Sequence, residues 1–142
     1  METLVLFVSP RAEDALRLSQ MLLSLPFRFD HVLTLEQARK KLSKHLYSAV
    51  LTEAALPDGT WLDVLRLARR KSPRTEVIVT DPFADAREWA EVLNRGGYDM
   101  IAQPFHEAEV RRILSNVCTR LGPEADLYRK EPAAQASARW AG

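Results

Sequence analysis

The sequence predicts an α/β protein built on a five-stranded, doubly wound parallel sheet with the flavodoxin-like strand order 2-1-3-4-5. Two observations lead to this fold class. Five short apolar runs alternate with five segments whose apolar residues recur at helical spacing. The connections between them are short, and right-handed crossovers then make the strands parallel. The order 2-1-3-4-5 is the natural one for five such strands.

The expected strands are short and rich in aliphatic residues. They span residues 4–8, 29–33, 49–52, 77–80 and 100–102. The first run is apolar throughout, which is typical of a central parallel strand buried on both faces. The second is less apolar, so we place it nearer an edge of the sheet.

The expected helices follow the strands and end at helix-breaking residues. The first covers residues 11–25 and is stopped by Pro26. Thr34 caps the second, with Gln37 at the capping-box position. The others cover residues 60–71, 85–95 and 106–121. The second helix is expected to bury Ala38, Leu42 and Leu46, and the fourth Ala86, Trp89, Ala90 and Leu93.

Length and composition indicate one domain, at residues 1–121, followed by a flexible tail at 122–142. Trp140 is an unusual residue in such a tail. No apolar run approaches the ~18 residues that cross a bilayer, no secretory signal precedes the first strand, and Cys118 is the single cysteine. These features predict a cytoplasmic protein without a membrane partner.

Charge gives no support for nucleic-acid binding. The formal net charge is +1, whereas proteins that hold nucleic-acid phosphates carry a clear basic excess. Two local basic runs occur, at residues 39–44 and 66–71, in the last turns of expected helices. We interpret them as solvated helix ends, where cations favour the negative end of the dipole.

Four segments in order resemble bacterial response-regulator receiver domains. They are the strand Val5 to Val8, the loop Leu56-Pro57-Asp58-Gly59, Thr80, and the run from Gly96 to Phe105, which is similar to Gly-x-Tyr-Asp-x-x-x-Lys-Pro-Phe. The resemblance covers residues 4–120. It implies a receiver fold, a setting in phosphorelay signal transduction, and a cis bond between Gln103 and Pro104.

The same resemblance shows departures at the phosphorylation site. Glu53 stands where the family has its phosphoacceptor aspartate. Its extra methylene moves the oxygens outward, and errors of about 1 Å can cost ~10²-fold in rate. Ser9 and Pro10 replace the acidic pair that helps to hold a divalent cation, and Mg²⁺ requires hard oxygen ligands.

The remaining positions also weaken the case for phosphoryl transfer. Gln103 replaces the family's lysine and carries no charge, so Thr80 alone is retained. We therefore predict no enzyme activity, no catalytic residue, no metal and no cofactor. We further expect Thr80 to donate a hydrogen bond to Glu53, which would hold the domain near an activated shape without a switch.

The expected output face also departs from the family. Met100 replaces the aromatic residue that changes rotamer on activation. The surrounding helices carry mixed charges at Arg87, Glu91, Arg95, Arg111 and Arg112. Such a surface suits a signalling protein or a second copy, docked through the last two helices and the fifth strand.

The resulting prediction is a receiver-like module that binds proteins independently of phosphorylation. Two alternatives stay open at this point. The first is a functional phosphoacceptor that uses Glu53 or Asp58. The second is an α/β domain that binds an anion or small ligand in the strand-end crevice, with Arg11 near a helix N-terminus. No Gly-rich phosphate loop follows the first strand.

Overall fold

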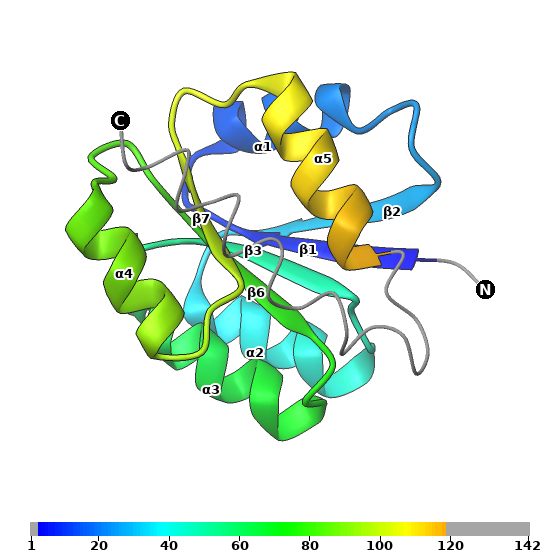
Figure 1. Cartoon of the computed structure of the whole chain (residues 1–142). Coiled ribbons are helices and arrows are strands. Elements are labelled where there is room, and N and C mark those ends of the chain that lie inside the picture. The colour runs from blue at the N-terminus through cyan, green and yellow to red at the C-terminus, as the bar shows by residue number, and fades with distance from the viewer. Residues whose placement is uncertain (1–2, 119–142) are drawn as a thin grey trace.

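A parallel sheet with helices on both faces forms the structure, a computed structural model that describes residues 3–118 (Figure 1). Its strands are, in chain order, β1 (Thr3–Val8), β2 (Phe27–Val32), β3 (Ala49–Glu53), β6 (Glu76–Asp81) and β7 (Asp99–Ala102). The spatial order is β2-β1-β3-β6-β7, and every neighbouring pair is parallel. The predicted fold class and strand order are confirmed, with β6 and β7 as the fourth and fifth strands.

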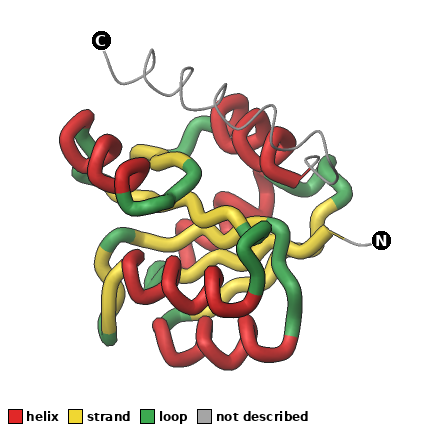
Figure 2. The backbone as a smooth tube through the Cα atoms, turned by 60° about the horizontal axis from the view of Figure 1, so that its bottom comes forward, coloured by secondary structure: helices red, strands yellow, loops and turns green. Residues whose placement is uncertain are grey.

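Helices cover both faces of this sheet, as the tube view also shows (Figure 2). They are α1 (Ala12–Met21), α2 (Leu35–Lys44), α3 (Trp61–Lys71), α4 (Ala86–Asn94) and α5 (Glu107–Cys118). Helices α1 and α5 lie on one face, while α2, α3 and α4 lie on the other (Figure 1). A short hairpin of β4 (Ala55–Leu56) and β5 (Gly59–Thr60) fills the loop between β3 and α3, where the sequence predicted only a tight turn.

The core is divided by the sheet into two apolar clusters. Successive strand residues point to opposite faces, so Phe7 packs with α1 and α5, while its neighbours Leu6 and Val8 pack with α2 and α3. All three side chains are fully buried. The continuous apolar run at the start of the chain is therefore explained by burial on both faces.

Three details differ from the expectations. Helix α1 ends at Met21 rather than Leu25, and β2 begins at Phe27, directly after Pro26. Leu46 is 61% exposed because α2 ends at Lys44 and the chain continues in extended form. In α4 the fully buried residue is Val92, which the sequence did not predict; of the predicted stripe, Trp89 packs against the core, Ala90 and Leu93 are half-buried, and Ala86 is exposed.

Gly96 ends α4, as predicted. Its φ of 106° lies in the region that only glycine adopts at low cost. The Gln103–Pro104 peptide bond is cis, as the resemblance implied. No helix within residues 3–118 has the length and apolarity needed to cross a bilayer. The expected tail and Trp140 lie outside the described residues.

Candidate functional site

Four of the predicted site residues meet at the carboxyl ends of the strands. Ser9 follows β1, Glu53 is the last residue of β3, Thr80 lies near the end of β6, and Gln103 follows β7. Parallel register brings these ends to one edge of the sheet, with Glu53 directly beside Thr80 on the neighbouring strand. This edge is where doubly wound folds place their working site.

The Glu53 side chain is turned into the protein, and the residue is only 5% exposed. The Ser9 hydroxyl donates to its Oε2 at 2.7 Å. The Gln103 amide donates to its Oε1 at 3.5 Å, and the Arg11 guanidinium Nε lies 3.9 Å from the same oxygen. Both carboxylate oxygens therefore have partners supplied by this chain, which offsets the cost of burying the charge.

Ser9 is itself held in place. Its hydroxyl accepts a hydrogen bond from the backbone N–H of Arg11 at 3.0 Å, and it is fully buried. The His31 Nε2 lies 2.8 Å from the Ser9 carbonyl, an acceptor, so this nitrogen carries the proton. The His31 ring also stacks on Phe7, with centroids 5.8 Å apart. These contacts orient the serine toward Glu53.

Sequence reasoning missed this role of His31. The signal was available in the strand register, because β1 and β2 are parallel neighbours and Phe7 pairs with His31. A histidine one residue before the end of an edge strand can reach the loop that follows the neighbouring strand. The sequence suggested that Arg11 could meet an external anion, whereas its guanidinium faces the Glu53 carboxylate of the same chain.

Thr80 and Glu53 do not bond directly, so the expected hydrogen bond from the threonine hydroxyl is a wrong prediction. The Gln103 amide lies between them, donating to Thr80 Oγ1 at 3.3 Å as well as to the glutamate. Thr80 is fully buried. The two residues are thus coupled through Gln103, the residue that stands in the lysine position.

The residues around Glu53 do not fit a divalent cation. No group of three or more His, Cys, Asp or Glu side chains within residues 3–118 has metal-ligand geometry. Pro10 has no side-chain donor and is exposed. Arg11 brings a positive charge to the carboxylate oxygen that a hard cation would need. Asp14, one helical turn further on, has one buried carboxylate oxygen without a hydrogen-bond partner among these residues.

Asp58 lies away from the strand ends and has a structural role. Its Oδ1 accepts the backbone N–H of Leu35 at 2.8 Å, and its Oδ2 accepts that of Glu36 at 3.0 Å. These are unsatisfied donors of the first turn of α2, so Asp58 caps a helix from a distant hairpin. This engagement of both oxygens opposes the alternative of phosphate transfer to Asp58.

The charged residues of the predicted interaction face are largely exposed, and two of its arginines form ion pairs along their own helices. Arg95 donates to Glu91 at 3.1 Å along α4, and Arg111 lies 3.6 Å from Glu107 along α5. Arg87 on α4 and Arg112 on α5 are also exposed. Met100 is fully buried in the same apolar cluster as Val92 of α4, so the position of the family's switch residue is part of the core.

A group of three acids, which sequence reasoning missed, lies where β6 leads into α4. Asp81 ends the strand, Asp85 caps the helix by accepting the Glu88 N–H at 2.8 Å, and the Glu88 side chain turns back toward Asp81. Burial raises the pKa of Glu88 to about 7, with further contributions from Asp81 and Asp85. The signal in the sequence was three acids within eight residues.

No protein-family model matches the chain. It is 24% identical over 91 residues to the response regulator protein PilR of Pseudomonas aeruginosa, covering 64% of this chain and 20% of PilR. It is 32% identical over 84 residues to the probable transcriptional regulatory protein y4xI of Sinorhizobium fredii, covering 59% of this chain and 37% of that protein. The chain therefore spans between a fifth and two fifths of the length of these relatives.

Solved structures share the architecture. One is the receiver domain of a sensor histidine kinase from Pseudomonas aeruginosa, which has a magnesium ion in its active-site cleft. It is 26% identical, with a TM-score of 0.72, over 83% of this chain and 98% of that domain. Residues 3–118 therefore have the fold of a receiver domain of two-component response regulators.

Proposed function

We propose that this domain is a signalling module that binds proteins without being switched by phosphorylation. The proposal rests on the contacts that engage both carboxylate oxygens of Glu53. Ser9, Gln103 and Arg11 supply two hydrogen-bond donors and one positive charge to its carboxylate. The charge at the phosphoacceptor position is thus balanced by the chain itself.

Phosphoryl transfer makes two demands that this arrangement does not meet. A nucleophilic oxygen must be free and aligned with the donor, whereas both oxygens of Glu53 are engaged. The negative charge that develops on the phosphoryl group must also be stabilised. The cation ligands and the lysine that would do so are replaced by Ser9, Pro10 and Gln103.

The buried carboxylate replaces a switch with a fixed contact. Gln103 connects Glu53 on β3 with Thr80 on β6, so the ends of these strands and the start of the loop to α5 are held together. We infer that the domain keeps one shape and presents a constant surface. The mixed charges of α4 and α5 suit that surface to a signalling partner, with ion pairs setting the orientation.

The test is treatment with acetyl phosphate, with and without Mg²⁺, followed by intact-mass measurement. We expect no phosphoryl adduct on the wild-type chain. A fourfold variant, with Ser9→Asp, Pro10→Asp, Glu53→Asp and Gln103→Lys, restores the family's residue types and is expected to gain one phosphoryl group. Circular dichroism of both proteins checks that the variant is folded.

A functional phosphoacceptor is the competing function. It would form an acyl phosphate on a Glu53 oxygen while the phosphorus–oxygen bond of the donor breaks and acetate leaves. A magnesium-dependent adduct on the wild-type chain that Glu53→Gln abolishes would establish it and overturn our proposal. An adduct that persists in Glu53→Gln and disappears in Asp58→Asn would place the phosphoryl group on the hairpin.

A further inference from the structure

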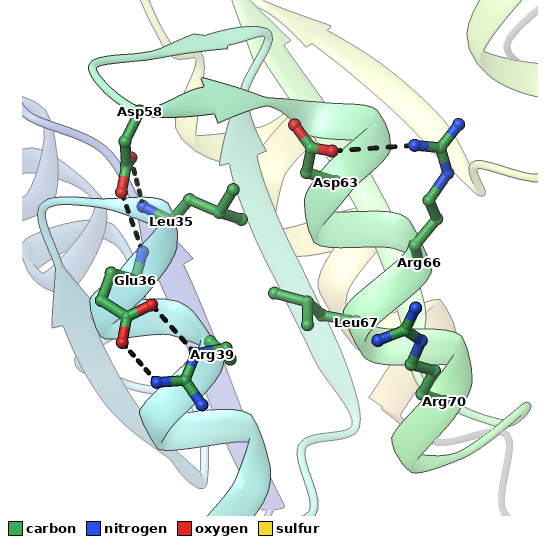
Figure 3. Close-up of a pocket in the computed structure, with 8 residues that line it drawn as sticks. All are labelled: Leu35, Glu36, Arg39, Asp58, Asp63, Arg66, Leu67 and Arg70. Carbon is green, nitrogen blue, oxygen red and sulfur yellow. Dashed lines mark hydrogen bonds and ion pairs between the residues drawn. The ribbon is translucent and has the colours of Figure 1, made fainter.

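A groove lies between α2 and α3, and Asp58 of the β4–β5 hairpin also lines it. Its wider part has a cavity volume of about 390 Å³. A second hollow of about 230 Å³ lies beside it, and Arg39, Leu67 and Arg70 line both. Figure 3 shows Leu35 of α2 and Leu67 of α3 pointing toward one another between the helices. The groove thus offers apolar contact along its floor.

The acids of the groove are already engaged. Asp58 binds two backbone N–H groups, and Glu36 pairs with Arg39 (Figure 3). Asp63 accepts the Thr60 N–H at 3.0 Å and lies 3.7 Å from Arg66. Each of these acids therefore has a partner within the molecule.

Arg70 is different, because its guanidinium has neither a hydrogen-bond partner nor an ion-pair partner within residues 3–118. It is exposed and lies beside Leu67 (Figure 3). The two basic runs of the sequence meet at this place, where the Lys71 ammonium donates to the Ser43 carbonyl of α2 at 3.4 Å. An apolar floor beside unpaired positive charge fits an aromatic or aliphatic side chain with carboxylates next to it.

This chain itself carries such a segment. Phe83, in the connection from β6 to α4, is 85% exposed and is the most exposed large apolar side chain within residues 3–118. The carboxylates of Asp81, Asp85 and Glu88 surround it in sequence. Asp81 Oδ1 accepts the Phe83 N–H at 2.9 Å, which fixes the loop. An aromatic anchor on a fixed loop binds at a low cost in conformational entropy.

We propose that the α2–α3 groove binds the Phe83 loop of a second copy of this chain, with the phenyl ring on Leu67 and the loop carboxylates facing Arg70. Phe83 is too exposed to occupy the groove of its own molecule. This contact differs from pairing through α4, β7 and α5, and it does not depend on the state of Glu53. Since one loop fills a small groove, we expect weak, salt-sensitive association.

Sedimentation velocity over protein concentrations from about 10 μM to about 1 mM tests the contact. We expect the wild-type chain to associate with rising concentration, and Phe83→Ser and Arg70→Glu each to weaken association at least about tenfold. Leu23→Ser and Arg17→Glu are the matched controls. Leu23 is 80% exposed and Arg17 lies on α1, across the sheet from the groove, so both are expected to leave association unchanged.

Mixing the two defective variants decides which surfaces pair. Phe83→Ser keeps the groove and Arg70→Glu keeps the loop, so the mixture is expected to form a one-to-one complex that neither variant forms alone. A mixture that stays monomeric overturns the pairing of loop with groove. A wild-type chain that remains monomeric throughout overturns self-association and leaves the groove to an acidic segment of another protein.

Discussion

Acidic side chains lie at two neighbouring strand ends, and their charges are stabilised in different ways. At the end of β3, Glu53 is buried and has its partners from Ser9, Gln103 and Arg11. At the end of β6, Asp81, Asp85 and Glu88 lie close together, and burial and mutual repulsion raise the pKa of Glu88 to about 7. Asp81 accepts the backbone N–H of Phe83, Asp85 accepts that of Glu88, and the Glu88 side chain meets Asp81.

The two sites differ in whether the charge of the carboxylate is already neutralised within the molecule. A carboxylate whose charge is balanced inside the molecule has little to gain from a metal or a phosphoryl group. Carboxylates that repel one another gain from a proton or from an approaching cation. We therefore propose a structural role for Glu53 and a binding role for the loop before α4, where the Phe83 side chain is exposed.

The largest expected loss of stability comes from removing the hydrogen bond that Ser9 donates to the buried Glu53 carboxylate. Ser9→Ala deletes the 2.7 Å hydrogen bond to a buried carboxylate and leaves Oε2 without its donor. We expect the free energy of unfolding to fall by about 2–3 kcal/mol, as for a charge-assisted bond to a buried group. Urea denaturation measures this loss.

A double-mutant cycle with Glu53→Gln sharpens that result. If the serine acts through the carboxylate, Ser9→Ala costs clearly less when residue 53 is already neutral. Equal losses in the two backgrounds would contradict a balanced charge at this position and would indicate a packing role for the serine.

The next largest loss of stability is expected at Asp58, whose carboxylate is stabilised by the N-terminus of α2. Asp58→Ala removes the acceptor for the N–H groups of Leu35 and Glu36, and we expect a loss of about 1–2 kcal/mol in unfolding free energy. Asp58→Asn keeps one acceptor oxygen and should lose less. Hydrogen exchange is expected to show faster opening of the first turn of α2, and unchanged exchange there would contradict the cap.

The pH dependence of stability tests the acidic group formed by Glu88, Asp81 and Asp85. Its pKa is raised to about 7 in the folded state, so the protonated form is favoured by folding. The stability that this group contributes is present below the unfolded pKa of about 4.5 and is lost as the pH rises through about 7. Because Glu88 is partly exposed, solvent screening keeps the effect below about 1 kcal/mol.

Glu88→Gln removes this pH dependence. We expect its melting temperature to match that of the wild-type chain near about pH 5 and to exceed it near about pH 8. Glu91→Gln is the control on the same helix, since Glu91 pairs with Arg95 and its loss should bring no gain at the higher pH. A Glu88→Gln protein without an advantage at high pH would contradict repulsion within the cluster.

The sequence predicted the fold more fully than it predicted the site. Apolar periodicity placed all five strands of the main sheet and all five helices, because burial on two faces leaves a strong pattern, as in the run from Val5 to Val8. Helix ends were less predictable, and Leu46 lies outside α2 because the chain becomes extended at His45. That choice depends on how β3 joins the sheet, which local sequence does not encode.

Within the site, position was predictable but contacts were not. Parallel register brings Ser9, Glu53, Thr80 and Gln103 to one edge whatever their rotamers. Whether Glu53 meets Thr80 or Gln103 depends on side-chain torsions, and there the prediction was wrong. The partnership of Arg11 with Glu53 and the cap from Asp58 to α2 join residues 42 and 22 or more positions apart, respectively, which periodicity does not reveal.

The smallest expected loss of stability comes from removing the charge of Arg11 near Glu53. Its guanidinium lies 3.9 Å from Glu53, but its side chain is 57% exposed. A pair with one exposed partner contributes about 0.2–1 kcal/mol, and salt weakens it. We expect Arg11→Gln to lower the unfolding free energy by no more than that, with the difference shrinking as ionic strength rises. Arg17→Gln on α1, where Arg17 has no acidic partner within residues 3–118, serves as the matched control. A loss from Arg11→Gln as large as that from Ser9→Ala, and insensitive to salt, would mean that the cation rather than the hydroxyl balances Glu53.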